Sequence, residues 1–377
     1  MRIVFAGGGT GGHLYPGLAI ARALVRLEPA VRPFFVGARR GIEREVLPKT
    51  EFEHLLLDLH PLYRSRPWEN WRTAAGLAGA WRALSRALGT ESPRVVVGTG
   101  GYASGATLAW GVAHGVPIAL QEQNSHPGIT TRIFSRWARE LYLGYGEAAR
   151  LLHPPRGAWM GETGNPVAPP PEPRPDRAAA RHRWGFPEHG GTVLLIFGGS
   201  QGARAVNEVV DAWIARGVPD GVFVIWGTGR GSHARFAGRE SERVRVVPYL
   251  SPIEEAYAAS DLAVARAGAL TLAELCAWGI PAILVPLPTA AADHQTANAR
   301  ALAGADAAVM VPQAELTVER LEREIGALTG DPGRLAVLAG RAAARGRPRA
   351  AEDIAERLLN LAHVEQLRDL RGAARQQ

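Results

Sequence analysis

Short apolar runs alternate with longer amphipathic segments along almost the whole chain, and this alternation constrains the fold most strongly. Such runs, separated by helix-length segments, predict βαβ units around a parallel sheet. Six runs precede residue 150 and six follow residue 190. They are RIVFA (2–6), PFFVG (33–37), HLLLDL (54–59), RVVVG (94–98), PIALQ (117–121), ELYLG (140–144), TVLLIFGGS (192–200), VFVIWG (222–227), VRVVPYL (244–250), DLAVARAG (261–268), PAILVPLP (281–288) and AAVMVP (307–312).

A proline-rich segment separates the two sets of runs. Six prolines fall within residues 165–175, which predicts a semi-rigid, extended connection. Near the other end, Ile354, Leu358 and Leu361 share one helical stripe that should pack on a surface which the sequence does not identify. The predicted fold is therefore α/β with two Rossmann-like, doubly wound domains. Their expected bounds are 1–164 for the N-terminal domain, 165–190 for the linker, 191–345 for the C-terminal domain and 346–377 for a last helix and tail.

Composition narrows the compartment and the partners. The single cysteine, Cys276, cannot build a disulfide framework, and no Cys/His cluster has zinc spacing. A strand begins at once after Met1, which leaves no room for a signal peptide, and no 18 apolar residues run together. The net charge of +7 comes almost wholly from arginine, since Lys49 is the one lysine, and this favours phosphate-bearing or anionic partners. The basic residues are scattered without a recognition motif, so no nucleic-acid partner is expected.

Three predicted strands run directly into glycine turns and then into helices, at residues 7–12, 98–101 and 198–202. Free N–H groups and the helix dipole attract anions in this geometry, although glycine can equally serve only to turn the chain. Three such loops in two domains favour the anion interpretation. A nicotinamide-binding protein would place an acid at the end of the second strand, where this chain has Val36 and Gly37, so that class is disfavoured.

Seven motifs, in order and spacing, resemble those of the MurG family of bacterial glycosyltransferases, within glycosyltransferase family 28. The resemblance implies a GT-B fold whose two domains face a central cleft. It also implies inverting transfer of N-acetylglucosamine from UDP-N-acetylglucosamine to the C4 hydroxyl of undecaprenyl-linked muramyl-pentapeptide, the step from lipid I to lipid II of peptidoglycan synthesis, by a peripheral protein at the cytoplasmic face of the cell membrane. The motifs are GGGTGGHLYPGLAIA (7–21), VGTGGYASGATLAW (97–110), QEQNSHPGITTR (121–132), TGNPV (163–167), FGGSQGARAVN (197–207), RAGALTLAE (266–274) and HQTANA (294–299).

The same resemblance assigns roles to individual residues. Within the donor set, residues 200–202 would meet the phosphates, Leu250 the uracil, and Glu274 the ribose, with His294 and Gln295 near the sugar. Glu274 as a solvated helix acid and Gln295 as a capping amide remain the alternatives. Ala168 departs from the family, which commonly has arginine there. The implied donor residues are Thr10, Gly11, Gly12, Asn124, Ser200, Gln201, Gly202, Leu250, Arg266, Ala269, Leu270, Thr271, Glu274, His294 and Gln295, and Gly100, Gly101 and Tyr102 are assigned to the acceptor.

A displacement at the sugar needs a base for the acceptor proton and a counter-charge for the departing diphosphate. His13 closes the first glycine turn at a helix start and is the predicted base; its alternative role is to position the turn, with Glu122 or His126 then next. The chain has no Asp-x-Asp pair, so no metal or other cofactor is expected. Helix dipoles, loop N–H groups and Arg266 would stabilise the leaving group.

A helix starting near Pro67 is predicted to place Arg72, Arg82 and Arg86 on one face. The opposite face should pack on the sheet through Leu77, Trp81, Leu84 and Leu88. The residues around Pro67 form an apolar and basic rim that suits anionic lipid headgroups. They are Leu62, Tyr63, Arg64, Arg66, Trp68 and Trp71.

Three rival functions remain at this point. The chain could be a GT-B transferase with another lipid acceptor such as diacylglycerol, a UDP-sugar epimerase or NAD-dependent oxidoreductase, or a nucleotide-sugar sensor without catalytic activity.

Overall fold

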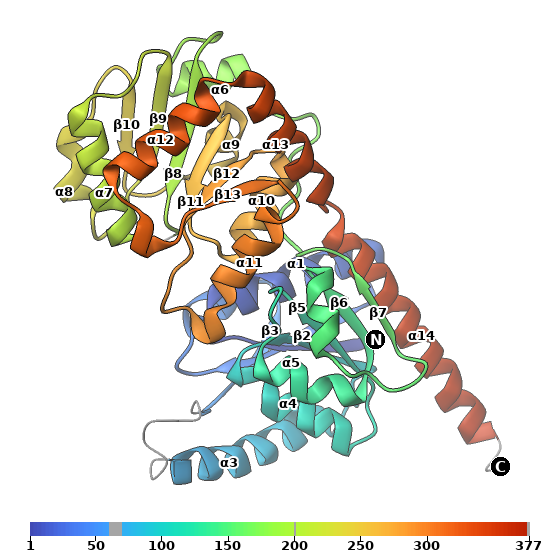
Figure 1. Ribbon diagram of the computed structural model, residues 1–377. Helices are drawn as coiled ribbons and strands as arrows, with labels where there is room; N and C mark the ends of the chain where they lie inside the picture. Colours follow the sequence, from blue (N-terminus) through green and yellow to red (C-terminus); the bar gives the residue numbers. More distant parts are fainter. Residues whose placement is uncertain (60–69, 200, 375–377) are drawn as a thin grey trace. The chain divides into compact units, whose positions relative to one another are not determined.

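The computed structural model describes residues 1–59, 70–199 and 201–374, and the chain in it forms two compact units (Figure 1). The first unit contains Met1–Val167 together with Arg349–Gln377, and the second contains Ala168–Pro348. The chain therefore leaves the first unit once, builds the second, and returns.

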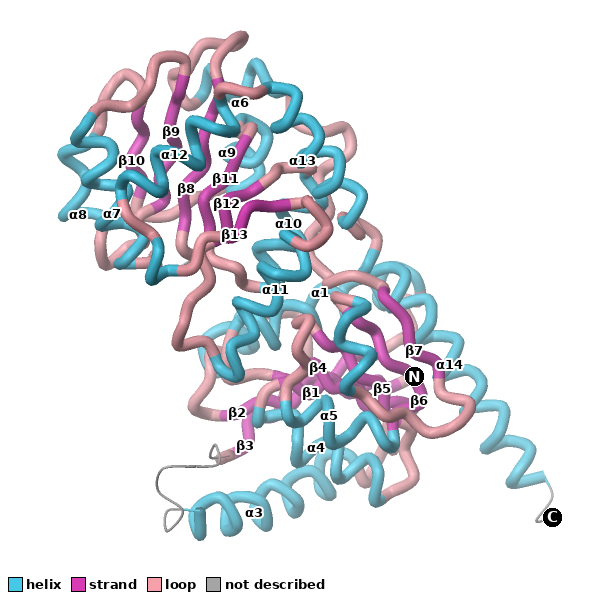
Figure 2. Tube along the Cα trace, viewed as in Figure 1, coloured by secondary structure: helices cyan, strands magenta, loops and turns pink. Residues whose placement is uncertain are grey.

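The first unit is built on one parallel sheet of seven strands in the order β3-β2-β1-β4-β5-β6-β7 (Figure 2). All six strands predicted for this half are confirmed, and the short edge strand β7, which carries Gly161, was not predicted. The strands are β1 (Arg2–Gly7), β2 (Arg32–Ala38), β3 (Glu53–Leu57), β4 (Val95–Gly100), β5 (Ile118–Glu122), β6 (Ala138–Leu143) and β7 (Trp159–Glu162).

Helices cover both faces of this sheet, because side chains alternate along each strand. Ile3 and Phe5 of β1 pack with α1 on one face, whereas Val4 packs with α3 and α4 on the other. The helices are α1 (Gly11–Leu27), α2 (Glu43–Val46), α3 (Asn70–Leu88), α4 (Tyr102–Ala113), α5 (Ile129–Phe134) and α14 (Ala350–Ala374), with short 3-10 turns η1 (Leu47–Lys49), η3 (Ser135–Trp137) and η4 (Gly146–Leu151).

Helix α14 belongs to the first unit although it follows the second in sequence. Ile354 and Leu358 are fully buried among residues of α1 and β1, and Leu361 packs against the same core. Arg357 contacts Glu140 of β6 through two hydrogen bonds of 3.0 and 3.1 Å and lies 3.5 Å above the Trp159 ring. The predicted stripe is thus confirmed, and its partner is now known.

The predicted packing face of α3 is wrong in part. Leu84 and Leu88 are buried as expected, but Leu77 and Trp81 are exposed by 47% and 39%. Ala80 is the third buried residue, so the true stripe follows a spacing of four residues and the larger side chains point to solvent. Ala80 belongs to the same buried cluster as Leu84 and Leu88.

The second unit has a parallel sheet of six strands in the order β10-β9-β8-β11-β12-β13. All six predicted strands are confirmed. They are β8 (Thr192–Phe197), β9 (Val222–Gly227), β10 (Val244–Val247), β11 (Leu262–Ala265), β12 (Ala282–Leu284) and β13 (Ala308–Met310).

Helices α7 and α12 share a core with one face of this sheet, through Val210 and Trp213 on α7 and Ile325 and Leu328 on α12. Helix α10 packs against both α9 and α13. The helices are α6 (Arg177–Arg183), α7 (Arg204–Arg216), α8 (His233–Phe236), α9 (Ile253–Ala259), α10 (Ala269–Trp278), α11 (His294–Ala303), α12 (Val318–Thr329) and α13 (Pro332–Arg345), with 3-10 turns η5 (Ala237–Arg239), η6 (Ala291–Asp293) and η7 (Gln313–Glu315).

Within the segment expected to be a linker, residues 177–183 form α6. Its buried Arg181 donates to Asp261 at 2.6 Å, so this helix is fastened to the second unit.

Each sheet reverses its strand order once, between β1 and β4 in the first unit and between β8 and β11 in the second. Ligands of doubly wound folds bind beyond the carboxyl ends of the strands at such a switch point. The glycine turns after β1, β4 and β8 all lie at these two places.

Candidate functional site

In the first unit, the glycine turns after β1 and β4 contact each other backbone to backbone. Gly8 N–H donates to Gly100 O at 3.4 Å. Gly101 has φ +77°, and a Cβ on it would overlap Gly8 O. A residue with a side chain could not be accommodated here without moving the first turn, so this pair of glycines is a structural requirement of the switch point.

His13 lies where these two turns meet, in the first turn of α1. Its Nδ1 is 3.2 Å from both Gly8 O and Thr10 Oγ1, and its ring packs on Gly100 and Gly101. When Nδ1–H donates to Gly8 O, Nε2 is the nitrogen able to accept a proton. Thr99 also donates to His13 O at 2.7 Å. The half-buried imidazole is therefore oriented by the turn that carries it.

Buried side-chain amides support the same edge from below. Gln123 donates to Thr99 O at 2.8 Å, Gln121 donates to Asn165 Oδ1 at 3.2 Å, and Asn165 donates to Gln123 O at 2.9 Å. All three amide side chains are at most 3% exposed. A buried network with satisfied partners rigidifies the loops that it joins, here those after β4, β5 and β7.

Glu122 is committed to its own loop. One carboxylate oxygen accepts from the backbone and side-chain nitrogens of Asn124 at 3.0 and 3.3 Å, and the other accepts from Gly128 N at 3.0 Å. Glu122 is 3% exposed, so its geometry favours a role in holding Asn124 in the loop after β5 rather than in taking a proton.

Glu43 was not singled out from the sequence. It is fully buried, it accepts from Ala38 N at 3.0 Å, and a Cβ on Gly8 or Gly41 would overlap its carboxylate, while one on Gly37 would overlap its aliphatic stem. Glu43 thus supports the β1 turn from beneath. A charged residue in an amphipathic segment gives no signal of such burial, and only the nearby glycines hinted at a close approach.

In the second unit, the turn after β8 packs on the turn after β9. Gly202 has φ +75°, and a Cβ there would overlap Thr228 O, while Gly229 closes on the backbone of Gln201. Asn207 of α7 fixes this arrangement because it donates to Thr228 O at 2.7 Å and accepts from the Trp226 indole at 3.1 Å. Ser200, the first residue assigned to the phosphates, lies outside the described residues.

Arg266 follows β11 and is held by the neighbouring strand. Its guanidinium donates to Val285 O and Pro286 O at 3.1 Å each and to Gln313 Oε1 at 2.7 Å. Burial lowers the pKa of Arg266 from its usual value, which marks a partly desolvated cation. Such a cation is suited to an anionic ligand.

The segment before α11 has strained backbone. Ala292 and Asp293 have φ of +52° and +53°, values that residues with a side chain rarely adopt and that often mark functional loops. His294 Nδ1 lies 2.7 Å from Ala291 O, and Gln295 accepts from Leu287 N at 3.0 Å. Gln295 caps the loop after β12 through its amide oxygen, as its alternative role predicted, and its amide nitrogen is a hydrogen-bond donor.

The first turn of α10 begins at Ala269, directly after Gly268, and Leu270 and Glu274 share one helix face. Glu274 accepts from the hydroxyl of the buried Tyr257 at 2.8 Å. Leu250, after β10, is buried and packs on Gly227 at the end of β9. The predicted donor residues that are described in this unit therefore follow β8, β10, β11 and β12 at one edge of the sheet.

Two family models cover most of the chain: the glycosyltransferase family 28 N-terminal domain matches residues 3–143, and the C-terminal domain matches residues 193–357. The chain belongs to glycosyltransferase family 28. The resemblance that the motifs indicated is thereby confirmed at the level of the family.

Relatives in the family match almost from end to end. An enzyme of Prosthecochloris aestuarii is 38% identical over 370 residues, covering 97% of this chain and 100% of that protein. One of Moorella thermoacetica is 38% identical over 375 residues, covering 95% and 98%. Both are named UDP-N-acetylglucosamine--N-acetylmuramyl-(pentapeptide) pyrophosphoryl-undecaprenol N-acetylglucosamine transferase.

Solved structures confirm the GT-B type of α/β fold that the family implies. MurG of Acinetobacter baumannii superposes with a TM-score of 0.76 at 25% identity, over 95% of this chain and 99% of that one. UDP-GlcNAc 2-epimerase from Neisseria meningitidis, bound to UDP-GlcNAc, superposes with a TM-score of 0.63 at 14% identity over 96% of this chain and 100% of that one, which shows a shared fold alone.

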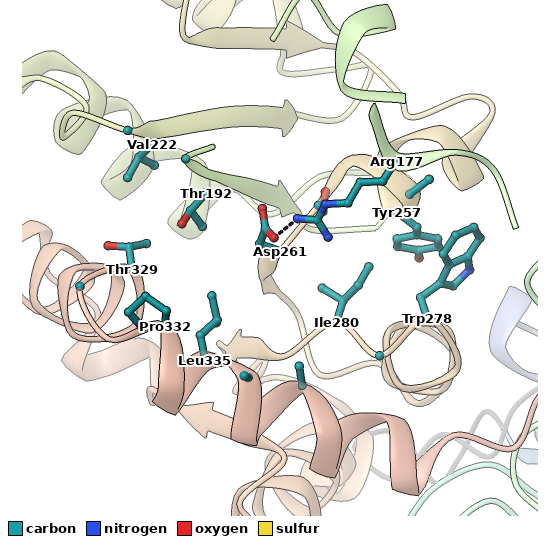
Figure 3. Close-up of a pocket in the computed structure, with 18 of the residues that line it drawn as sticks. Arg177, Thr192, Val222, Tyr257, Asp261, Trp278, Ile280, Thr329, Pro332 and Leu335 are labelled. Carbon is teal, nitrogen blue, oxygen red and sulfur yellow. Dashed lines mark hydrogen bonds and ion pairs between the residues drawn. The ribbon is translucent and has the colours of Figure 1, made fainter. Parts of the chain in front are cut away.

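The cavity in Figure 3 lies at the other edge of the family 28 C-terminal unit. It has a volume of about 860 Å³ and is lined by residues at the amino ends of the strands, including Thr192, Val222 and Ile280. The two arginines that line it are already engaged: Arg177 binds Asp261, and Arg174 donates to the carbonyls that end α10. None of the predicted donor residues that the structure describes lines this cavity, although Tyr257, whose hydroxyl bonds to Glu274, and Trp278 do.

Exposed apolar side chains lie on α3 and on the α5–η3 segment. Helices α3 and α5 each contact α4. The apolar side chains alternate with the exposed arginines Arg82, Arg86, Arg132 and Arg136. Trp68, Arg64 and Arg66 fall outside the described residues, and Trp71 and Arg72 lie in α3 without described side chains. No helix in the described part of the chain is long and apolar enough to cross a bilayer. The exposed apolar residues are Leu77, Trp81, Ile129, Ile133 and Trp137.

Proposed function

We propose that this chain transfers N-acetylglucosamine from UDP-N-acetylglucosamine to the C4 hydroxyl of a polyprenyl-diphosphate-linked N-acetylmuramyl-pentapeptide, the lipid I to lipid II step of peptidoglycan synthesis. The observation that carries the proposal is 38% identity to the Prosthecochloris aestuarii transferase over 97% of this chain. Full-length coverage matters because donor and acceptor sites would reside in different units.

The second unit is proposed to bind the donor. Arg266 offers a partly desolvated cation, and the glycine turn at Gly202 and the start of α10 offer N–H groups at helix N-termini, where diphosphates bind. Glu274 offers a carboxylate whose second oxygen can accept hydrogen bonds from the ribose hydroxyls. We propose that Leu250 contacts the uracil and that His294 and Gln295 contact the sugar.

The first unit is proposed to bind the acceptor and to supply the base, with Gly100, Gly101 and Tyr102 contacting the acceptor. Asn124, with Thr10, Gly11 and Gly12, would contact the donor from this unit. His13 Nε2 takes the proton of the C4 hydroxyl while that oxygen forms a bond to the anomeric carbon. The bond from the anomeric carbon to the diphosphate oxygen breaks, UDP leaves with the electron pair, and configuration inverts. No oxidant or reductant takes part in this displacement.

Mass spectrometry separates this function from its rivals. The protein is incubated with UDP-N-acetylglucosamine and a short-chain lipid-linked muramyl-pentapeptide, and the masses of the products are measured. One N-acetylhexosamine added to the acceptor, with one UDP released, supports the proposal. An isomerised nucleotide sugar formed without the acceptor would show an epimerase, and transfer to diacylglycerol alone would show another acceptor class.

We also propose that α3 and the α5–η3 segment contact anionic lipid at the cytoplasmic face of the membrane. Leu77 and Trp81 expose apolar surface beside Arg82 and Arg86, the composition of helices that lie on a bilayer surface. The residues before α3 that were predicted to meet lipid lie outside the described residues. The proposal therefore rests on the exposed residues of α3 and of the α5–η3 segment.

Replacing Leu77 and Trp81 together by Ser should weaken binding to phosphatidylglycerol vesicles by about tenfold or more, because each buried apolar side chain contributes roughly 1.5–3 kcal/mol. Val337→Ser is the matched control, since Val337 is 54% exposed on the second unit. Equal vesicle affinity of the double variant, the control and the parent protein would refute the membrane contact.

A further inference from the structure

We propose that Tyr257 is a positioning residue for donor binding: it holds the Glu274 carboxylate in place, with one face left open to the ribose hydroxyls. The inference rests on the proposed donor function and adds to it a residue outside every motif that identified the site. Tyr257 lies on α9, between the motifs at residues 197–207 and 266–274.

The geometry of the pair is specific. The Tyr257 hydroxyl donates to Glu274 Oε2 at 2.8 Å, and Tyr257 is only 3% exposed. Its ring is braced by Phe197, with centroids 6.3 Å apart, and by Trp278, with centroids 5.7 Å apart. Phe197 is the last residue of β8 before the glycine turn, and Trp278 ends α10, so the ring is fixed between the two elements that carry donor residues.

This bond controls what Glu274 can offer. An ionised carboxylate only accepts hydrogen bonds, and with Oε2 engaged by Tyr257 it still has Oε1 to accept from a ribose diol. A protonated carboxyl would bring one hydrogen of its own and lose that complementarity. A fixed, ionised carboxylate also avoids the entropy cost of ordering a free side chain on binding.

The surroundings of Glu274 oppose its ionised form, and the hydrogen bond from Tyr257 favours that form. Burial raises the pKa of Glu274, the nearby Glu254 raises it further, and the hydrogen bond from Tyr257 acts against both. Burial, together with Glu274, Glu254 and Tyr249, raises the pKa of Tyr257 well above its usual value, so this residue stays a hydrogen-bond donor at neutral pH. Burial raises the pKa of Cys276, which lies on α10 with Glu274, and Arg345 lowers it.

Tyr257→Phe removes the hydroxyl alone and keeps the ring. We expect the dissociation constant for UDP to rise about tenfold, which is the weight of a hydrogen bond to a charged group, with kcat unchanged at saturating donor. The loss should be larger at lower pH, because without the Tyr257 hydroxyl the Glu274 carboxyl takes up a proton at a higher pH. Calorimetric titration with UDP at a series of pH values measures both effects.

Two comparisons make the result specific. Tyr142→Phe is the matched control, because Tyr142 is also buried and donates to a glutamate, Glu140, at 2.7 Å in the first unit. It should cost similar stability and leave UDP affinity unchanged. Second, 2′-deoxy-UDP lacks one hydroxyl of the diol, so the parent protein should discriminate against it and Tyr257→Phe should discriminate less.

The outcomes separate the inference from the function on which it rests. If Tyr257→Phe keeps the parent's UDP affinity, pH profile and discrimination, while Glu274→Gln loses affinity, Tyr257 is a packing residue and the inference is overturned with the donor site intact. If Glu274→Gln also binds UDP like the parent, the ribose role of Glu274 falls too. A parent protein that binds no UDP overturns the proposed function itself.

Discussion

The two switch points of this molecule share a strand order but are supported in different ways. In the first unit, the loops rest on side chains that are almost wholly buried, with Gln121, Gln123 and Asn165 bonded to one another and to the loop backbone. In the second, partly exposed side chains such as Arg266 and Gln295 reach from the loops to neighbouring carbonyl and amide groups. The first edge is held by several amides within the core, whereas the second combines one buried amide, Asn207, with side chains at its surface.

This difference suits the two proposed tasks. A general base must keep its position to a fraction of an ångström, which a satisfied buried network provides. Residues that close on a nucleotide sugar must instead exchange internal hydrogen bonds for ligand contacts, which half-exposed side chains can do at lower cost. The following variants test whether the two edges are separable in this way.

The largest effect is expected at the edge held from within. His13→Ala should lower kcat by about 10²- to 10⁴-fold, the usual contribution of a general base, while UDP affinity and Tm stay nearly unchanged because the donor residues lie mainly on the other unit. Steady-state kinetics at saturating donor and acceptor measure the effect, and calorimetry measures UDP binding.

His13→Asn distinguishes a base from a residue that only positions the turn. Asparagine can still bond to Gly8 O and Thr10 Oγ1 but cannot take up a proton at neutral pH. Near-native kcat in this variant would assign His13 to the turn. A loss that disappears at saturating acceptor would assign it to acceptor binding instead.

A matched pair of buried amides sharpens the comparison. Gln123→Leu and Asn207→Leu each leave a buried backbone carbonyl without its donor, so each should lower the free energy of unfolding by about 1–3 kcal/mol. The first should reduce kcat, because Thr99 also holds His13, and the second should weaken UDP binding, because Thr228 packs on Gly202. Denaturant unfolding and calorimetry read these out, and the same functional loss in both variants would show that the edges are not separable.

The smallest effect concerns the attachment of α14. Arg357→Ala removes a two-point ion pair with the largely buried Glu140 and the contact over Trp159, and should cost about 1–2 kcal/mol of stability. Arg26→Ala breaks a pair whose arginine is 60% exposed, and should cost under about 0.5 kcal/mol. Equal shifts in Tm for the two variants would contradict the burial argument.

The sequence predicted the sheets well because each strand has a local signature. Runs such as RVVVG and TVLLIF are buried on both faces and read as continuous apolar segments, and twelve such runs became twelve strands. β7 gave no comparable signal, because its four residues are at best partly buried and include Gly161 and Glu162.

Tertiary choices were harder to predict. Leu77 and Trp81 fit the same helical stripe as Leu84 and Leu88, and periodicity alone favours the large side chains over Ala80, which the structure buries. The engagement of Glu122 by its own loop, the support from Glu43 and the bond from Tyr257 to Glu274 depend on distances between segments. Motif spacing carries no information about them.

The return of α14 to the first unit has a consequence for synthesis on the ribosome. Ile354 and Leu358 cover an apolar surface of α1, and this surface stays uncovered while residues 168–348 are translated. That takes roughly ten seconds or more at about 5–20 residues per second. During that interval the nascent chain exposes a hydrophobic face that only its last helix can cover. Truncation before residue 350 should therefore give a product that aggregates or stays bound to chaperones, even though both sheets are complete.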